Sequence, residues 1–74
     1  MIDQNKIREI LKQAGLDINP SEDDFDKSFR DLGIDSLDVF SFLSEIEMAE
    51  DIAISDSDFE KINTLNDVIS FLNG

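Results

Sequence analysis

The residues with the clearest capacity for chemistry lie in one run of eight, Asp-Leu-Gly-Ile-Asp-Ser-Leu-Asp, at residues 31–38. The run predicts the start of a helix: Gly33 permits a tight turn, Asp35 can cap the helix, and Ser36 would be its first residue. A helix start presents unpaired N–H groups and a partial positive charge. A phosphate ester on the Ser36 hydroxyl would be well seated there. Taken alone, a serine at this place is more often an ordinary capping residue.

The chain lacks two residue types on which many enzymes and metal sites depend. Its 74 residues include no cysteine and no histidine. Disulfides, thiolate metal sites and Ser–His or Cys–His nucleophile pairs are therefore excluded. A carboxylate enzyme stays possible, but so short a chain can hardly enclose a water-excluding pocket. We therefore expect a protein that is not an enzyme, without catalytic residues and without a metal site.

Acidic residues dominate the charge, 18 against 6 basic ones, for a net charge of −12. The imbalance is concentrated after residue 30, where eleven acidic residues accompany a single basic one, Lys61. Such a surface repels nucleic acid and anionic membranes, and it favours encounter with basic protein surfaces. Single scattered acids often serve only solubility, but their concentration here favours a docking face.

Hydrophobic spacing predicts an all-α fold in a single domain over residues 1–74. Helices are expected at 3–15, 36–50 and 65–73, with a short one at 56–61. Lys6, Arg8 and Lys12 should lie on the solvent side of the first helix. The expected core residues recur at helical intervals: Ile7, Ile10, Leu11 and Ala14; Val39, Phe42, Leu43, Ile46 and Ala49; Phe59; Leu65, Val68, Ile69 and Leu72.

The connection at 16–35 is unusually long for a compact domain, so it should carry structure or function. Six apolar residues are spaced through it and should pin it to the helices: Leu16, Ile18, Phe25, Phe29, Leu32 and Ile34. In the second helix, Leu37, Phe40 and Met48 lie off the core stripe. They could form a contact patch, or a central helix could touch neighbours on several sides, and the sequence leaves both open.

The start of the chain does not resemble a targeting signal, because polar residues follow Met1-Ile2 directly. No apolar run is long enough to span a bilayer. We expect a free-standing, monomeric protein in the cytoplasm.

The run at 31–38 resembles the phosphopantetheine attachment motif of acyl carrier proteins, D-L-G-x-D-S-L-[DE]. The resemblance covers essentially the whole chain. Further similar segments are Ser28-Phe29, the acidic stretch 45–47, residues 52–56, and residues 59–62 and 64–74, which match the third and fourth helices of the family. It implies a small four-helix acyl-carrier-type bundle with three main helices, one short helix and a long first loop.

The resemblance also implies a carrier function. A phosphopantetheinyl transferase would use coenzyme A and Mg²⁺ to attach 4′-phosphopantetheine to Ser36, between the motif residues Asp35 and Leu37, which makes the chain a phosphoprotein. The arm would carry an acyl chain as a thioester for fatty acid biosynthesis, polyketide synthesis or a related specialised pathway of lipid metabolism. Acyl-transferring or chain-elongating enzymes would dock through basic surfaces on a face that matches the family at Asp35, Leu37, Asp38, Phe40, Glu47 and Asp56.

Several positions depart from the family pattern. Ser41 and Met48 stand where many fatty-acid carriers have glutamate, and Phe40 and Phe42 are bulkier than the usual aliphatic residues. The second helix is therefore less acidic and more aromatic, which suggests the hypothesis of a carrier dedicated to one pathway. Asp35 in place of histidine argues against a peptidyl carrier.

Proteins of other classes were weighed against this interpretation. Asp56-x-Asp58-x-Glu60 begins like a calcium-binding EF-hand loop, but Lys61 and Asp67 stand where glycine and glutamate are needed. A structural or inhibitory acidic protein, such as a nucleic-acid mimic, would need the charge but not the eight-residue motif. A small serine hydrolase is excluded because no histidine base exists.

Overall fold

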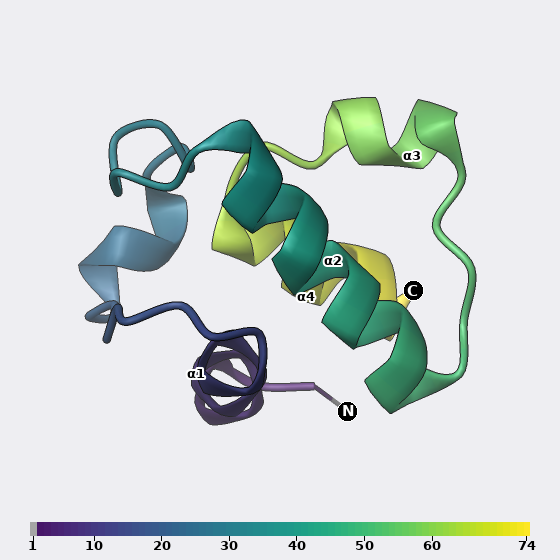
Figure 1. Ribbon diagram of the computed structural model, residues 1–74, viewed down its shortest axis with the longest axis horizontal. Helices are drawn as coiled ribbons and strands as arrows, with labels where there is room; N and C mark the ends of the chain where they lie inside the picture. The colour runs from purple at the N-terminus through teal and green to yellow at the C-terminus, as the bar shows by residue number, and fades with distance from the viewer. Residues whose placement is uncertain (1) are drawn as a thin grey trace.

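The computed structural model describes residues 2–74, which form four α-helices and one 3₁₀ helix (Figure 1). The α-helices are α1 (Gln4–Gln13), α2 (Ser36–Glu50), α3 (Asp56–Lys61) and α4 (Leu65–Asn73), and the 3₁₀ helix is η1 (Asp23–Asp26). In Figure 1, α2 runs through the centre in front of α4, and α1 is seen nearly end-on. Helix α1 packs against α2 and α4, and η1 packs against α4. The predicted all-α fold with three main helices and one short helix is confirmed.

Each α-helix begins at a polar side chain that accepts a hydrogen bond from a backbone N–H three residues further on. These caps are Asp3, Asp35, Ser55 and Thr64. Thr64 and Asp67 form a reciprocal capping box. Such caps satisfy N–H groups that lack a partner inside the helix. They explain why the predicted helix starts agree with the observed ones to within a residue.

One contiguous core joins the helices and the first loop. Its buried residues are Ile7, Ile10, Leu11, Phe25, Phe29, Ile34, Phe42, Leu43, Ile46, Ile62, Leu65 and Val68. The predicted loop anchors all contribute, because Leu16, Ile18 and Leu32 pack against this core as half-buried residues. The prediction for Ala49 was wrong, since this residue is exposed. It lies in the last turn of α2, and the chain then leaves along the outer edge of the molecule (Figure 1) through Asp51, whose φ of 53° is left-handed.

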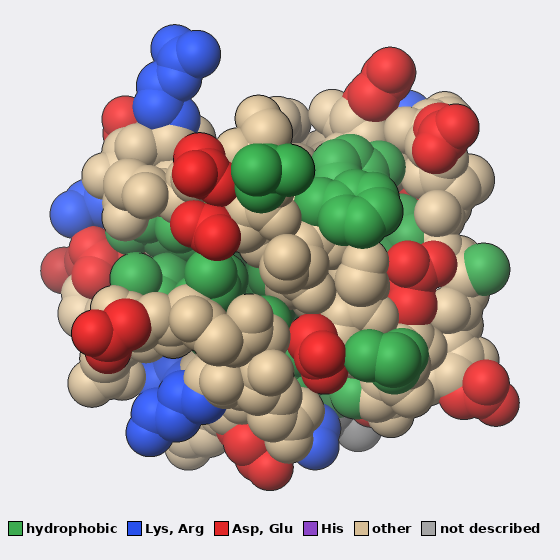
Figure 2. Space-filling model, in the orientation of Figure 1, with side chains coloured by type: hydrophobic (Ala, Val, Ile, Leu, Met, Phe, Trp, Pro, Cys, Tyr) green, Lys and Arg blue, Asp and Glu red, His purple; other side chains and the backbone are tan. Residues whose placement is uncertain are grey.

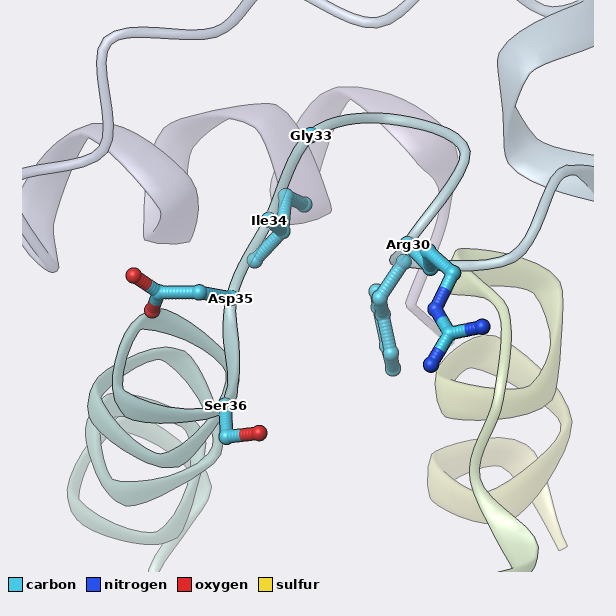
Figure 3. A pocket seen from close by; sticks show the side chains of 6 residues that line it. Arg30, Gly33, Ile34, Asp35 and Ser36 are labelled. Atoms are coloured by element: carbon cyan, nitrogen blue, oxygen red, sulfur yellow. The ribbon is translucent and has the colours of Figure 1, made fainter.

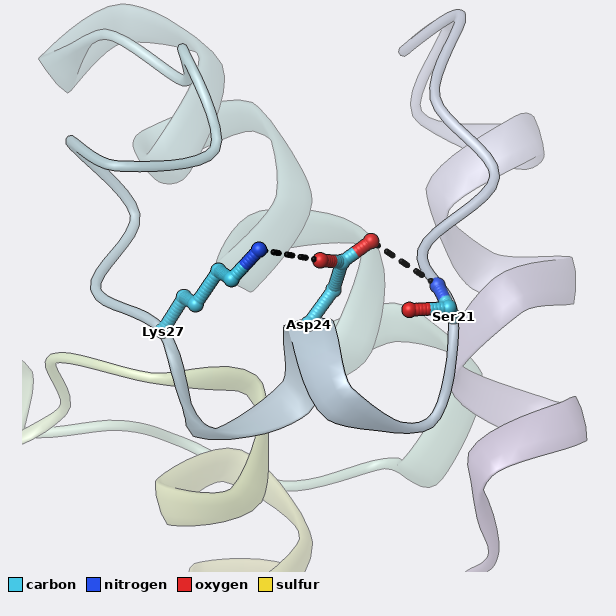
Figure 4. A network of polar contacts seen from close by, with 3 residues as sticks. All are labelled: Ser21, Asp24 and Lys27. Carbon is cyan, nitrogen blue, oxygen red and sulfur yellow. Dashed lines mark hydrogen bonds and ion pairs between the residues drawn. The ribbon is translucent and has the colours of Figure 1, made fainter.

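The first loop is more ordered than a solvated acidic run. Asp24 Oδ2 accepts from the Ser21 N–H at 3.0 Å, and Asp24 Oδ1 pairs with Lys27 Nζ at 2.9 Å (Figure 4). These contacts hold the first turn of η1 and lower the pKa of the Asp24 carboxyl, with the backbone N–H of Ser21 as the larger cause. The ion pair also raises the pKa of Lys27.

Arg8 ties α1 to the loop rather than lying on the solvent side as predicted. Its Nε donates to the Pro20 carbonyl at 2.8 Å, and its guanidinium lies 5.1 Å from the centroid of the Phe25 ring. A cation over an aromatic face is attracted electrostatically. The contact therefore joins the middle of α1 to η1. These residues are too far apart in sequence for helical periodicity to predict the contact.

The two ends of the described chain are also joined. The Ile2 N–H donates to Asn73 Oδ1 at 2.8 Å, and Asn73 Nδ2 donates to the Ile2 carbonyl at 2.9 Å. Across residues 2–74, no helix has the length and apolar character needed to cross a bilayer.

Candidate functional site

Ser36 is the first residue of α2, and its side chain is exposed. Asp35 precedes it with an extended backbone (φ −83°, ψ 176°), and Asp35 Oδ1 accepts from the Asp38 N–H at 2.9 Å. The capping role that a serine often has at a helix start thus belongs to Asp35. This arrangement leaves the Ser36 hydroxyl available for covalent chemistry at the positive end of the helix.

The segment before α2 is a hydrogen-bonded turn. The Ile34 N–H donates to the Phe29 carbonyl at 2.9 Å, and the Gly33 N–H donates to the Arg30 carbonyl at 3.0 Å. Gly33 has a φ of 77°, a left-handed value that any side chain would strain. The bonding pattern is the one that closes many helices. It places Ile34 in the core at 6% exposure, so Ser36 is held at a fixed position two residues later.

An open hollow of about 480 Å³ adjoins Ser36 (Figure 3). Its lining consists of Phe29, Arg30, Gly33, Ile34, Asp35 and Ser36. In Figure 3 the Ser36 hydroxyl points into the space between the start of α2 and the turn that carries Arg30. Sequence reasoning did not single out Arg30. The available signal was that it is the last basic residue before Lys61 in an otherwise acidic stretch.

The expected docking residues lie on α2 and α3, except for Asp35, which caps α2. Phe40 of α2 contacts Phe59 of α3. Their ring centroids are 6.2 Å apart with an interplanar angle of 44°. Leu37 is 78% exposed and Phe40 61% exposed, while Asp38 is half-buried and Asp56 is exposed. Figure 2 shows hydrophobic side chains over this part of the molecule, with acidic side chains between them. Both explanations for the apolar residues off the core stripe find support: Leu37, Phe40, Met48 and Ile52 are exposed, while Phe40 also contacts Phe59 of the neighbouring helix.

Glu47 differs from the other expected docking residues because its carboxylate has a structural partner. Glu47 Oε2 accepts from the Ile54 N–H at 3.0 Å, and the Glu47 carbonyl accepts from the Ile52 N–H at 3.1 Å. Both contacts hold the linker between α2 and α3 against the end of α2. The side chain is half-buried.

The calcium-loop alternative does not match the local structure. Asp56 begins the six-residue helix α3, and the Asp58 N–H donates to Ser55 Oγ at 3.1 Å. A capped helix therefore stands where an EF-hand would need a coordinating loop. Among residues 2–74, no three acidic side chains gather as candidate metal ligands.

Comparison with known proteins gives matches along most of the chain. A family model described as a phosphopantetheine attachment site matches residues 4–72. An acyl carrier protein of Exiguobacterium sp. (strain ATCC BAA-1283 / AT1b) is 39% identical over 64 residues, which cover 85% of this chain and 78% of the relative. No solved structure is significantly similar. Because the match includes the start of α2, the loop before it and all four helices, this chain belongs to the acyl carrier protein family, whose shared domain is a phosphopantetheine attachment site.

Proposed function

We propose that this protein carries acyl intermediates on a 4′-phosphopantetheine arm attached to the Ser36 hydroxyl. The observation that carries the proposal is the exposed Ser36 at the first position of α2, with Asp35 as the cap. When bound, the arm supplies the thiol that holds an acyl group as a thioester, which a chain without cysteine cannot supply itself. The protein is then a carrier and the substrate of a phosphopantetheinyl transferase, not a catalyst.

Attachment requires one group transfer from coenzyme A. A bond forms between Ser36 Oγ and the phosphorus next to the pantetheine unit, and the phosphoanhydride bond of coenzyme A breaks. Adenosine bisphosphate leaves, and the hydroxyl proton passes to a base on the transferase, with Mg²⁺ balancing the phosphate charges. The contribution of this chain is position: the N-terminal N–H groups of α2 favour negative charge on Ser36 Oγ.

Partner enzymes are proposed to dock on the face of α2 and α3 that contains Asp35, Leu37, Asp38, Phe40, Glu47 and Asp56. The apolar side chains of Leu37 and Phe40 are exposed enough to enter a partner's pocket as anchors. Acidic neighbours would steer the encounter with a basic surface and make it sensitive to salt. We propose a single domain that acts as a cytoplasmic monomer.

The deciding experiment is intact-mass analysis after incubation with a broad-specificity phosphopantetheinyl transferase, coenzyme A and Mg²⁺. Wild type should gain one phosphopantetheine, and Ser36→Ala should gain none. Ser41→Ala is the matched control, because Ser41 is an exposed serine on the same helix, and it should be modified like wild type. Modification of Ser36→Ala, or no gain by a folded wild type shown to be unmodified at the start, would refute the assignment.

The cargo pathway is a separate part of the proposal. The exposed Phe40 and Met48 make α2 more apolar than a docking helix that relies on charge alone. We therefore propose a carrier dedicated to one fatty-acid, polyketide or related pathway. Expression as the sole carrier in a host that lacks its own tests this. Bulk fatty-acid elongation at the normal rate would refute the dedicated role while leaving attachment at Ser36 intact.

A further inference from the structure

Arg30 is the last cation before the acidic part of the chain, and it makes no ion pair within residues 2–74, where Lys27 pairs with Asp24. Ten acidic residues lie between Arg30 and the next basic residue, Lys61. The Arg30 side chain is exposed. Its charge is therefore free to meet an anion that the polypeptide itself does not provide.

The backbone fixes where Arg30 stands. The Arg30 carbonyl accepts from the Gly33 N–H at 3.0 Å, and the N–H of the preceding Phe29 donates to the Asn63 carbonyl at 3.0 Å. Phe29 itself is 7% exposed and belongs to the core. Because Phe29 is buried and the turn to Gly33 is hydrogen-bonded, the backbone holds Arg30 at the wall of the hollow that Ser36 also lines (Figure 3).

The start of α2 would offset only part of the charge of a phosphodiester on Ser36. The Asp38 N–H is already taken by Asp35, whose carboxylate points away from the Ser36 hydroxyl (Figure 3). The other N–H groups at the helix start favour negative charge but supply no cation. A guanidinium binds phosphate oxygens with two parallel hydrogen bonds and is more suited to this than an ammonium.

Building on the proposed attachment at Ser36, we propose that Arg30 pairs with the phosphodiester of the arm across this hollow. Arg30 is thus a positioning residue: it restrains the first bonds of the arm and leaves the thiol end mobile. The pair is exposed, so salt should weaken it.

The test uses the arm-loaded protein and two NMR readouts that do not depend on enzyme activity. The first is the transverse relaxation rate and chemical shift of the phosphorus, in wild type, Arg30→Gln and Arg30→Lys. Lys12→Gln is the charge-matched control, because Lys12 is exposed in the last turn of α1 and does not line the hollow. The second is the Arg30 Nε–H signal of wild type before and after loading.

We expect Arg30→Gln to shift the phosphorus resonance and lower its transverse relaxation rate, because losing an exposed ion pair lowers the population of the restrained arm by about twofold. Arg30→Lys should fall between Arg30→Gln and wild type, and Lys12→Gln should match wild type. In wild type, loading should move the Arg30 Nε–H signal, and high salt should reverse the shift. A fully loaded Arg30→Gln with a wild-type phosphorus signal, or an Nε–H signal unchanged by loading, would overturn the inference while attachment at Ser36 stands. Failure of wild type to load would overturn both.

Discussion

Replacing Glu47 with alanine should loosen the linker between α2 and α3. Glu47 Oε2 is the acceptor for the Ile54 N–H at 3.0 Å, and Ile54 packs against the core. A hydrogen bond to a charged group contributes about 1.5–3 kcal/mol, and solvent access to this half-buried carboxylate favours a value near the lower limit, about 1–1.5 kcal/mol. A domain of this size has a total stability of roughly 3–5 kcal/mol. The loss is thus about a third of the total.

Urea unfolding and amide hydrogen exchange measure this effect. In Glu47→Ala the Ile54 N–H should exchange up to about tenfold faster, because 1.4 kcal/mol corresponds to a factor of ten. Glu47→Gln keeps an acceptor oxygen and should lose less than half as much stability. Glu45→Ala is the matched control. Glu45 is also a half-buried acid on α2, but its carboxylate accepts no hydrogen bond within residues 2–74.

The result also separates two roles for Glu47. If Glu47→Ala and Glu45→Ala unfold at the same urea concentration and Ile54 exchange is unchanged, the linker bond does not stabilise the fold. A loss of partner affinity in that stable variant would mean that the Glu47 carboxylate contacts the partner directly. Reduced stability together with weaker docking would instead mean that Glu47 acts by holding the linker in place.

Three further substitutions test the local geometry. Gly33→Ala should lower the free energy of unfolding in urea by about 1 kcal/mol, because alanine is strained in the left-handed conformation. No neighbouring atom lies within 4 Å of the added Cβ, so no steric clash should add to this. A much larger loss of stability would contradict this reasoning. Asp67→Ala should lower the free energy of unfolding by about 1 kcal/mol. It should also speed hydrogen exchange of the Asn63 and Thr64 N–H groups, which donate to the Asp67 carboxylate, and unchanged exchange would count against the capping box. Hydrogen bonds from Ser21 and Lys27 lower the pKa of the Asp24 carboxyl. The ionised Asp24 therefore stabilises the fold at neutral pH, and this stabilisation is lost as the pH falls through the lowered pKa of the folded state. The stability gap between wild type and Asp24→Asn should therefore narrow on acidification, and a constant gap would refute this.

The helices could be predicted because their signals are local. Thr64 and Asp67 are three residues apart, and the hydrophobic stripe from Leu65 to Leu72 repeats every three or four positions. Asp35 and Gly33 mark the start of α2 and the turn before it in the same way. Each of these features depends only on neighbours within one helical turn, so the sequence alone contains the information.

The unpredicted features depend on residues that are distant in sequence or on where the core ends. The contact between Arg8 and Phe25 joins α1 to η1. The place of Arg30 across the hollow from Ser36 depends on the closure of the turn at Gly33. Ala49 fits the hydrophobic periodicity of α2, but it lies in the last turn of the helix, where no neighbouring element covers it. The 3₁₀ helix has one local signal, because the Asp24 carboxylate can accept from the Ser21 N–H three residues earlier.

The acidic charge and the exposed apolar residues explain each other. Leu37, Phe40 and Met48 expose apolar side chains on α2 that would favour self-association in a neutral protein of this size. Two copies of this chain each carry a net charge of −12, and this charge would oppose their association through these side chains. A basic partner meets attraction instead, and the apolar anchors then contribute on contact. If the proposed docking role holds, the carboxylates that would raise the rate of encounter with a basic partner would also oppose self-association, so Phe40 could stay exposed on α2 without causing aggregation.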